Sequence, residues 1–257
     1  MISNRTDARE ALRKTGIAGL SPREVLLVTD FDGTLSHVVS DPAAATIHPG
    51  SKAALERLAS TLGHVAVLSS RQASDLERRV PVPGVELIGD SGLGEMSSDE
   101  RRRLDMFKVE AARVLADLPG VWVEAKSAGA AIHYRHAQIE PSKLLDLLGP
   151  AVRETHLIVQ PGRRVVEVIP RERPKGEALA GLIARRQPRG VICLGDDEND
   201  RPMFDWVGGL SGPHLTVGVA SDEARPDLFE GCDLVVSDPD EVSEFLTALA
   251  AWAGQDA

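Results

Sequence analysis

The sequence predicts an α/β protein whose doubly wound, mainly parallel sheet is interrupted by an inserted α+β domain. Three observations support this prediction. Toward both ends of the chain, short continuous apolar runs alternate with segments of helical periodicity. The middle of the chain instead contains strands in which apolar and polar residues alternate. The 257 residues are sufficient for such a core together with an insertion.

Six short apolar runs are expected to form the parallel sheet, because continuous runs of this kind are typical of strands buried on both faces. They lie at residues 25–28, 65–68, 85–88, 191–194, 216–219 and 234–236. Three helices are expected where apolar residues recur with helical spacing, at 51–62, 176–186 and 242–252. The resulting βαβα order favours a sheet with helices on both faces.

The middle of the chain predicts a separate αββαββ unit. Helices are expected at 99–118 and 141–153. Alternating polar and apolar residues predict four strands, at 121–126, 130–135, 156–160 and 164–169. The last two are expected to be joined across Pro161 and Gly162. The predicted domains are a core formed by residues 1–96 and 171–257, and an insertion formed by residues 97–170.

Charge and composition exclude several classes of protein. The chain has 29 Lys and Arg against 39 Asp and Glu, so its net charge of −10 gives no reason to expect a nucleic acid or an anionic membrane as partner. No apolar run approaches the roughly 18 residues of a membrane span, and the first residues lack the apolar core of a secretion signal. The two cysteines, Cys193 and Cys232, suit a reducing compartment. We expect a cytoplasmic protein that is a monomer or a weak homodimer.

The segment DFDGT at residues 30–34 directly follows the first predicted strand. Asp30 then lies at the carboxyl end of a strand, where open α/β sheets bind their ligands. An extended backbone points Asp32 in the same direction before Gly33 permits a turn. Because two neighbouring acids repel each other, they need a cation or a shared proton. Mg²⁺, which prefers oxygen ligands, is the expected cofactor.

Other predicted strands supply polar groups at the same edge of the sheet. Ser69 follows the second strand, and its hydroxyl can hold phosphate oxygens together with nearby N–H groups and Arg71, a candidate substrate-binding residue. Lys175 opens a predicted helix and can donate positive charge to a phosphate. The strand at 191–194 runs into a second acidic cluster, which includes Asp196, Asp197 and Asp200.

These motifs resemble those of the haloacid dehalogenase superfamily of phosphotransferases. The matching segments, in chain order, are DFDGT at 30–34, Ser69, Lys175 and GDDEND at 195–200. Their order and spacing extend over the whole predicted core, which makes the combination more specific than any one motif. The resemblance implies a Rossmann-like core with an inserted cap.

The resemblance also implies an aspartyl-phosphate mechanism. Asp30 attacks phosphorus, while Asp32 protonates the leaving sugar oxygen and then activates water. Mg²⁺ is held by Asp30, the backbone carbonyl of Asp32, and Asp196, and together with Lys175 it lowers the repulsion between the carboxylate and the phosphate. Two further acids are expected to orient Lys175 or metal-bound water: Asp197 and Asp200.

The insertion resembles the C2B-type cap of trehalose-6-phosphate phosphatases. Five residues match that family's E-x-K, H-Y-R and E elements: Glu124, Lys126, His133, Arg135 and Glu167. Strand alternation places Glu124 and Lys126 on one face, and likewise His133 and Arg135. The resemblance implies that all five bind the substrate. Without it, cross-strand pairs on a solvated sheet face are the more typical explanation.

Two positions after the third strand depart from this family. Where its members read G-x-H-G-x-E after the third strand, this chain has Ser91 and Gly94 in place of His and Glu. The predicted activity is hydrolysis of trehalose 6-phosphate to trehalose and phosphate, a step of trehalose biosynthesis. One alternative is the phosphatase of a related phosphorylated glycoside, such as glucosylglycerol phosphate, mannosyl phosphoglycerate or a validoxylamine-type phosphate. Another is an inactive sugar-phosphate sensor.

Overall fold

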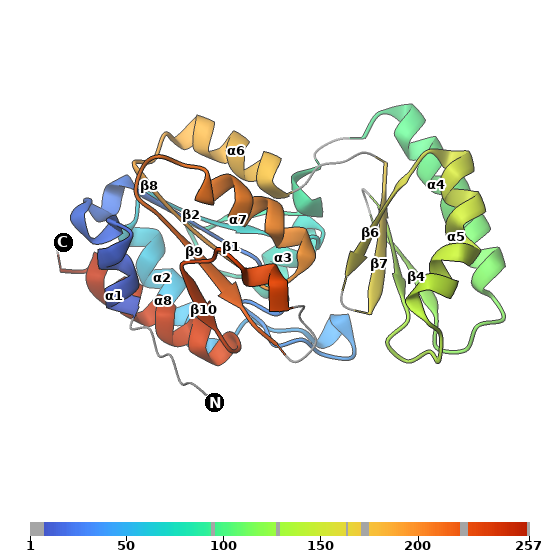
Figure 1. Ribbon diagram of the computed structural model, residues 1–257, viewed down its shortest axis with the longest axis horizontal. Helices are drawn as coiled ribbons and strands as arrows, with labels where there is room; N and C mark the ends of the chain where they lie inside the picture. The colour runs from blue at the N-terminus through green and yellow to red at the C-terminus, as the bar shows by residue number, and fades with distance from the viewer. Residues whose placement is uncertain are drawn as a thin grey trace. The chain divides into compact units, whose positions relative to one another are not determined.

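The computed structural model describes residues 8–93, 96–126, 129–162, 164–170, 175–221 and 226–255. Its contacts divide the chain into two compact units, Met1–Gly92 with Pro174–Ala257, and Leu93–Arg173. The larger unit contains a parallel sheet and the smaller one an antiparallel sheet (Figure 1). This architecture confirms the predicted fold class. Among the described residues, no helix has the length and apolar character needed to cross a membrane.

Six strands form the parallel sheet, in the order β10-β9-β8-β1-β2-β3. They are β1 (Val25–Thr29), β2 (His64–Leu68), β3 (Glu86–Ile88), β8 (Gly190–Gly195), β9 (His214–Val219) and β10 (Leu234–Val236). All five residues of β1 are buried. Leu27 packs into the hydrophobic cluster on one face of the sheet, and Leu26 and Val28 pack into the cluster on the other. Burial on both faces explains why the sequence of β1 is continuously apolar.

Helices cover both faces of this sheet (Figure 1). They are α1 (Ala8–Lys14), α2 (Pro49–Thr61), α3 (Ala73–Arg79), α6 (Lys175–Arg186), α7 (Arg201–Gly208) and α8 (Pro239–Ala253). The helices α1, α2 and α8 contribute to one hydrophobic cluster, and α6 and α7 to the other. The predicted helices at 51–62, 176–186 and 242–252 correspond to α2, α6 and α8.

The smaller unit is a four-stranded antiparallel sheet, in the order β4-β5-β7-β6, with two helices. Its elements are α4 (Ser98–Leu115), β4 (Trp122–Ala125), β5 (Ala130–His133), α5 (Pro141–Thr155), β6 (Ile158–Gly162) and β7 (Val165–Ile169). A capping box between Ser97 and Glu100 starts α4. Leu104 and Phe107 of α4 pack with Ile132 of β5 in a single hydrophobic cluster. One face of the sheet is therefore apolar, which leaves the other face for polar side chains.

The expected turn at Pro161 and Gly162 is wrong. Both residues belong to β6, where they pair with Val166 and Val165 of β7. Proline cannot donate an N–H to a sheet, but β6 is an edge strand, so Pro161 can leave its nitrogen on the unpaired side. The chain turns closer to Arg164, whose φ of 55° lies in the left-handed region.

Candidate active site

Three strands of the larger unit end in polar side chains along one edge of the sheet. The parallel register pairs Thr29 of β1 with Val67 of β2 and Leu194 of β8. The N–H of Asp30 then donates to the carbonyl of Leu194 at 3.0 Å. The first predicted site residues after β1, β2 and β8 are Asp30, Ser69 and Asp196, and all three are buried. The structure therefore places them at neighbouring strand ends.

Asp30, Asp196 and Asp200 form a buried carboxylate cluster. One oxygen from each lies within 4.8 Å of the others, and at most 5% of any of these residues is exposed. The DFDGT segment passes directly against the cluster, since a Cβ added at Gly33 would collide with the Asp196 carboxylate. Gly33 also has a φ of 78°, which favours glycine. Thr34 Oγ1 donates to Asp196 Oδ1 at 3.4 Å.

Lys175, the first residue of α6, is inserted between two of these acids and is 1% exposed. Its Nζ lies 2.7 Å from Asp200 Oδ1 and 2.8 Å from Asp30 Oδ1. Burial alone lowers the pKa of this ammonium, but the charges of Asp200 and Asp30 outweigh burial and raise it. Lys175 is therefore positively charged. The other Asp200 oxygen accepts the N–H groups of Asp196 and Asp197.

The Asp30 carboxylate lies in surroundings that favour a further cation. Burial raises the pKa of Asp30 to about 7, and the charges of Asp200 and Asp32 act in the same direction, while Lys175 opposes them. Asp30 Oδ1 has the ion pair with Lys175 but no well-directed hydrogen bond among the described residues. In the part of the chain that the structure describes, the ammonium of Lys175 lies against a cluster of three buried carboxylates, Asp30, Asp196 and Asp200. An oxygen-preferring divalent cation fits this donor set.

Two of the predicted site residues bond to nearby backbone. Ser69 Oγ accepts the N–H of Arg71 at 3.3 Å, which leaves the hydroxyl proton able to donate. Asp197 Oδ1 accepts the N–H of Glu198 at 2.7 Å and caps the turn Glu198–Asp200. Of the two acids expected to orient Lys175, the one that contacts its Nζ is Asp200.

Arg71 binds Asp32, a pairing that the sequence did not predict. Its Nε and Nη2 donate to the two carboxylate oxygens of Asp32, each at 2.7 Å. The remaining donors reach Asp75 Oδ2 at 2.8 Å and the carbonyl of Pro42 at 2.9 Å. Bidentate pairs of this kind fix the orientation of the carboxylate. Arg71 therefore holds Asp32 in place at the strand end that carries Asp30.

Asp75 of α3 anchors both Arg71 and Arg79. Burial raises the pKa of Asp75, but hydrogen bonds from Arg79 and Arg71 lower it to about 2. Because the folded-state pKa lies below the ordinary value, ionised Asp75 stabilises the fold above pH ~4, and the effect is lost as the pH falls toward 2. We expect Asp75→Asn to lower the free energy of unfolding by about 2 kcal/mol at neutral pH.

Urea titrations at several pH values check this expectation. The difference between Asp75→Asn and the wild type should narrow below pH ~4. Asp146→Asn, on the exposed surface of α5, is the control and should change stability by less than about 0.5 kcal/mol. A difference for Asp75→Asn that stays constant down to pH ~3 would contradict the role of its ionised form.

Four of the five predicted substrate-binding residues of the smaller unit lie on the polar face of its sheet. The strand register places Glu124 and Glu167 on either side of the small residue Ala131. His133 Nε2 lies 2.8 Å from Glu124 Oε2. Lys126 Nζ donates to Glu167 Oε1 at 2.5 Å. Carboxylates, an ammonium and an imidazole therefore share one surface, as strand alternation predicts for these residues.

Two further residues on this face were not predicted. Trp122 stacks on the ring of His133, with ring centroids 4.0 Å apart and planes 10° from parallel. Gln160 of β6 pairs with Glu167 in the register and so shares its face. Side chains two residues apart along a strand lie on the same face, so the sequence of β4 could have indicated Trp122 and that of β6 could have indicated Gln160. Arg135 lies beyond the end of β5.

The two departures from the family motif lie near the end of β3. Ser91 belongs to the turn Asp90–Gly92, and its N–H donates to the carbonyl of Ser69 at 2.9 Å. Ser91, which replaces the family's His, is therefore hydrogen-bonded to the predicted site residue Ser69 at the end of β2. Gly94 lies outside the described residues.

The fold and the site together define a phosphotransferase of the haloacid dehalogenase superfamily. Its features are the acidic segment after β1, the lysine that opens α6, the acidic cluster after β8, and an antiparallel cap inserted between the halves of a parallel core. The family model for trehalose-phosphatase matches residues 28–227. The chain belongs to the trehalose-phosphatase family, a family of phosphoric monoester hydrolases.

Individual proteins give the same result. The trehalose-phosphate phosphatase of Mycobacterium avium is 35% identical, over 97% of this chain and 68% of its own length. That of Mycobacterium tuberculosis is 33% identical, over 94% of this chain and 65% of its own length. The solved C-terminal domain of C. albicans trehalose-6-phosphate phosphatase has a TM-score of 0.72 at 23% identity, covering 95% of this chain and 97% of that domain. The predicted family and phosphatase class are confirmed.

Proposed function

We propose that the protein is a Mg²⁺-dependent phosphatase that hydrolyses trehalose 6-phosphate to trehalose and phosphate. The observation that carries this proposal is the insertion of Lys175 into the buried cluster of Asp30, Asp196 and Asp200. Phosphoryl transfer needs positive charge beside an attacking carboxylate, because the phosphate is itself an anion. The substrate is proposed from the mycobacterial relatives, which are named trehalose-phosphate phosphatases.

Asp30 is the proposed nucleophile. Its carboxylate attacks phosphorus, the bond between phosphorus and the sugar oxygen breaks, and an acyl phosphate forms on Asp30. Lys175 Nζ lies 2.8 Å from Asp30 Oδ1. Its positive charge therefore offsets the repulsion between the Asp30 carboxylate and the phosphate. The Ser69 hydroxyl, whose oxygen already accepts the N–H of Arg71, can donate to a phosphate oxygen.

Asp32 is the proposed acid and base. It gives a proton to the leaving sugar oxygen and then takes one from the water that attacks the acyl phosphate, which releases phosphate and restores Asp30. Arg71 donates one N–H bond to each oxygen of Asp32, and the remaining lone pairs of those oxygens can carry the proton. We therefore assign Arg71 the role of positioning Asp32.

The cation is proposed to be held by Asp30, Asp196 and the backbone carbonyl of Asp32. When bound, Mg²⁺ neutralises charge on the oxygens of the transferred phosphoryl group. Support comes from the all-oxygen donor set and from Asp30 Oδ1, which lacks a well-directed hydrogen bond among the described residues. Asp200 already holds Lys175 and two backbone N–H groups, so its part is to position the lysine.

The polar face of the smaller unit is proposed to bind the sugar. Glu124 and Glu167 can accept from sugar hydroxyls, and the small side chain of Ala131 leaves space between them. Trp122, 44% exposed, offers an aromatic ring to the apolar face of a sugar. The proposed donors are Lys126, His133 and Arg135.

Phosphate release from a panel of esters tests this function. The panel contains trehalose 6-phosphate, glucose 6-phosphate, glucosylglycerol phosphate and mannosyl phosphoglycerate, each with Mg²⁺ and with a chelator. Trehalose 6-phosphate should have the highest kcat/KM, and chelation should remove turnover until Mg²⁺ is restored. A higher value for another ester would correct the substrate and keep the mechanism. Binding of trehalose 6-phosphate without turnover of any ester would favour the sugar-phosphate sensor.

Replacing Arg71 separates positioning from substrate binding. We expect Arg71→Met to lower kcat by about 10- to 100-fold with little change in KM, because Asp32 loses its bidentate partner. Arg71→Lys should recover only part of kcat, since an ammonium cannot bind both oxygens in the same way. Arg78→Met, which alters an exposed pair with Asp75, is the control. A raised KM with unchanged kcat would instead support direct substrate binding by Arg71.

A further inference from the structure

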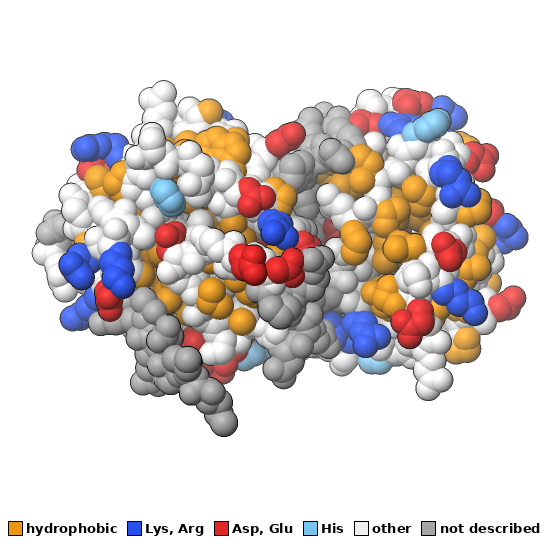
Figure 2. Space-filling model, viewed as in Figure 1, with side chains coloured by type: hydrophobic (Ala, Val, Ile, Leu, Met, Phe, Trp, Pro, Cys, Tyr) orange, Lys and Arg blue, Asp and Glu red, His pale blue; other side chains and the backbone are white. Residues whose placement is uncertain are grey.

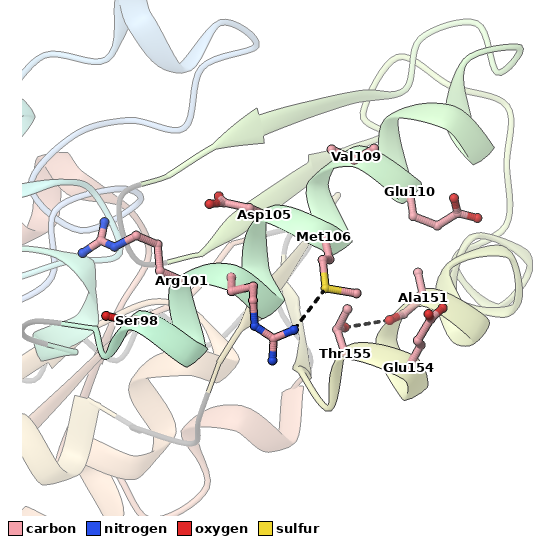
Figure 3. A pocket seen from close by; sticks show the side chains of 10 residues that line it. Ser98, Arg101, Asp105, Met106, Val109, Glu110, Ala151, Glu154 and Thr155 are labelled. Atoms are coloured by element: carbon pink, nitrogen blue, oxygen red, sulfur yellow. Dashed lines mark hydrogen bonds between the residues drawn. The ribbon is translucent and has the colours of Figure 1, made fainter.

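A hollow of about 730 Å³ lies between α4 and α5 of the smaller unit (Figure 3). Met106 and Val109 of α4 line it and are 43% and 72% exposed. Ala151 and Thr155 of α5 also line it, and both are small. Exposed apolar side chains beside a hollow, surrounded by polar groups, are typical of an interaction surface.

Four of the nine charged residues of α4 are arranged symmetrically about Met106. Arg102 and Glu110 lie four positions before and after it, and Asp99 and Arg113 lie seven positions before and after it. At about 100° per residue, all five point to the same side of the helix. If the helix is turned end for end about Met106, Asp99 takes the place of Arg113 and Glu110 takes the place of Arg102.

We propose that this side of α4 is the interface of a homodimer whose twofold axis passes by Met106. In an antiparallel pair of α4 helices, Arg102 of each protomer faces Glu110 of the other, and Asp99 faces Arg113. The twofold axis repeats each of these two contacts, so the dimer has four ion pairs between protomers. Met106 and Val109 of each protomer then pack against the hollow between α4 and α5 of the other. The occupant of the hollow is thus a second copy of this chain.

The four charges can make these contacts without losing the bonds they already have. Arg102 and Arg103 pair with Asp99 at 2.8 and 3.0 Å, and Arg113 pairs with Glu110 at 2.5 Å, all within one helix. The side chains of Arg102 and Arg113 are 67% and 70% exposed, so each has donors left for another carboxylate. Dimerisation therefore extends these existing ion pairs into larger networks.

The balance of signs favours a second copy over a partner of one charge. Arg101 and Glu154 also line the hollow, and neither has an ion-pair partner in the described part of the chain. Figure 2 shows hydrophobic, basic and acidic side chains interspersed on the visible face of the smaller unit. A nucleic acid or an anionic membrane would require an excess of basic residues. A self-complementary pattern is what a twofold contact needs.

Two double variants test this interface. D99R/R102E and E110R/R113E each exchange the two residues of one ion pair within the helix, so this pair is kept with its charges reversed. D99R/R102E also removes the pair between Asp99 and Arg103. In a homodimer of either variant, like charges face each other at all four contacts. In a heterodimer of the two variants, all four contacts are again between opposite charges. Sedimentation over a range of concentrations measures association, and circular dichroism checks that both variants are folded.

We expect the wild type to dimerise reversibly and more weakly in high salt. Each variant alone should have a dimer dissociation constant at least about 10-fold higher, and an equimolar mixture should recover association. K52E/E56K, which exchanges an exposed pair on α2, should associate like the wild type. The proposal is wrong if the wild type is monomeric up to about 100 µM. It is equally wrong if both variants dimerise normally or if their mixture does not recover association.

Discussion

Asp30→Asn should abolish phosphatase turnover, with a loss of at least about 10⁴-fold in kcat. An amide cannot form the acyl phosphate, and Lys175 alone offers no substitute nucleophile. The fold should be retained, because asparagine has nearly the same shape and Asp200 still pairs with Lys175 at 2.7 Å. Burial raises the pKa of Asp30 because it disfavours the charged carboxylate, so we expect that removing this charge does not lower the melting temperature.

Steady-state phosphate release and thermal melting are measured on the same preparations. Asp146→Asn provides a matched control, because it makes the same chemical change at an exposed position on α5. It should be indistinguishable from the wild type in both assays. Residual turnover of Asp30→Asn above about one hundredth of the wild-type rate would contradict the assignment of Asp30 as nucleophile.

Lys175→Met should have the largest effect on stability, about 3–5 kcal/mol in the free energy of unfolding. The ammonium is 1% exposed and contacts two buried carboxylates, Asp30 and Asp200. Its removal leaves their buried negative charges uncompensated. Turnover should also be lost, since the positive charge beside the nucleophile is gone.

Denaturant titration with and without Mg²⁺ measures this effect. Added Mg²⁺ should return part of the stability of Lys175→Met, because a bound cation compensates the same carboxylates. Lys52→Met, an exposed position on α2, is the control and should change stability by less than about 0.5 kcal/mol. A loss for Lys175→Met no larger than that of the control would mean that the buried ion pairs do not hold the site together.

The core strands could be predicted because burial on both faces leaves a continuous apolar run, as in β1. A helix was expected to follow Ser69 and Arg71, but the sequence did not give the bounds of α3. Only Leu76 is buried among its seven residues, so no apolar periodicity marks it. The turn expected at Pro161 and Gly162 followed from their turn propensity, which the pairing of β6 with β7 overrides.

The positions of Asp30, Lys175 and Asp196 could be predicted because each lies next to a strand or helix end that is visible in the sequence. The contacts of Arg71 could not. It is 39 residues from Asp32, and their pairing depends on how α3 and the segment after β1 fold together. Local patterns fix where a side chain lies along an element, whereas its partners depend on the tertiary structure.

The central claim is that Asp30 carries the phosphoryl group during turnover. Borohydride tests it directly, because it reduces an acyl phosphate of aspartate to homoserine. The enzyme is mixed with trehalose 6-phosphate and Mg²⁺, quenched in acid, reduced and analysed by peptide mass spectrometry. We predict homoserine in place of Asp30, and only in samples that contain both substrate and Mg²⁺. Homoserine at another aspartate, or none during steady turnover, would contradict this account.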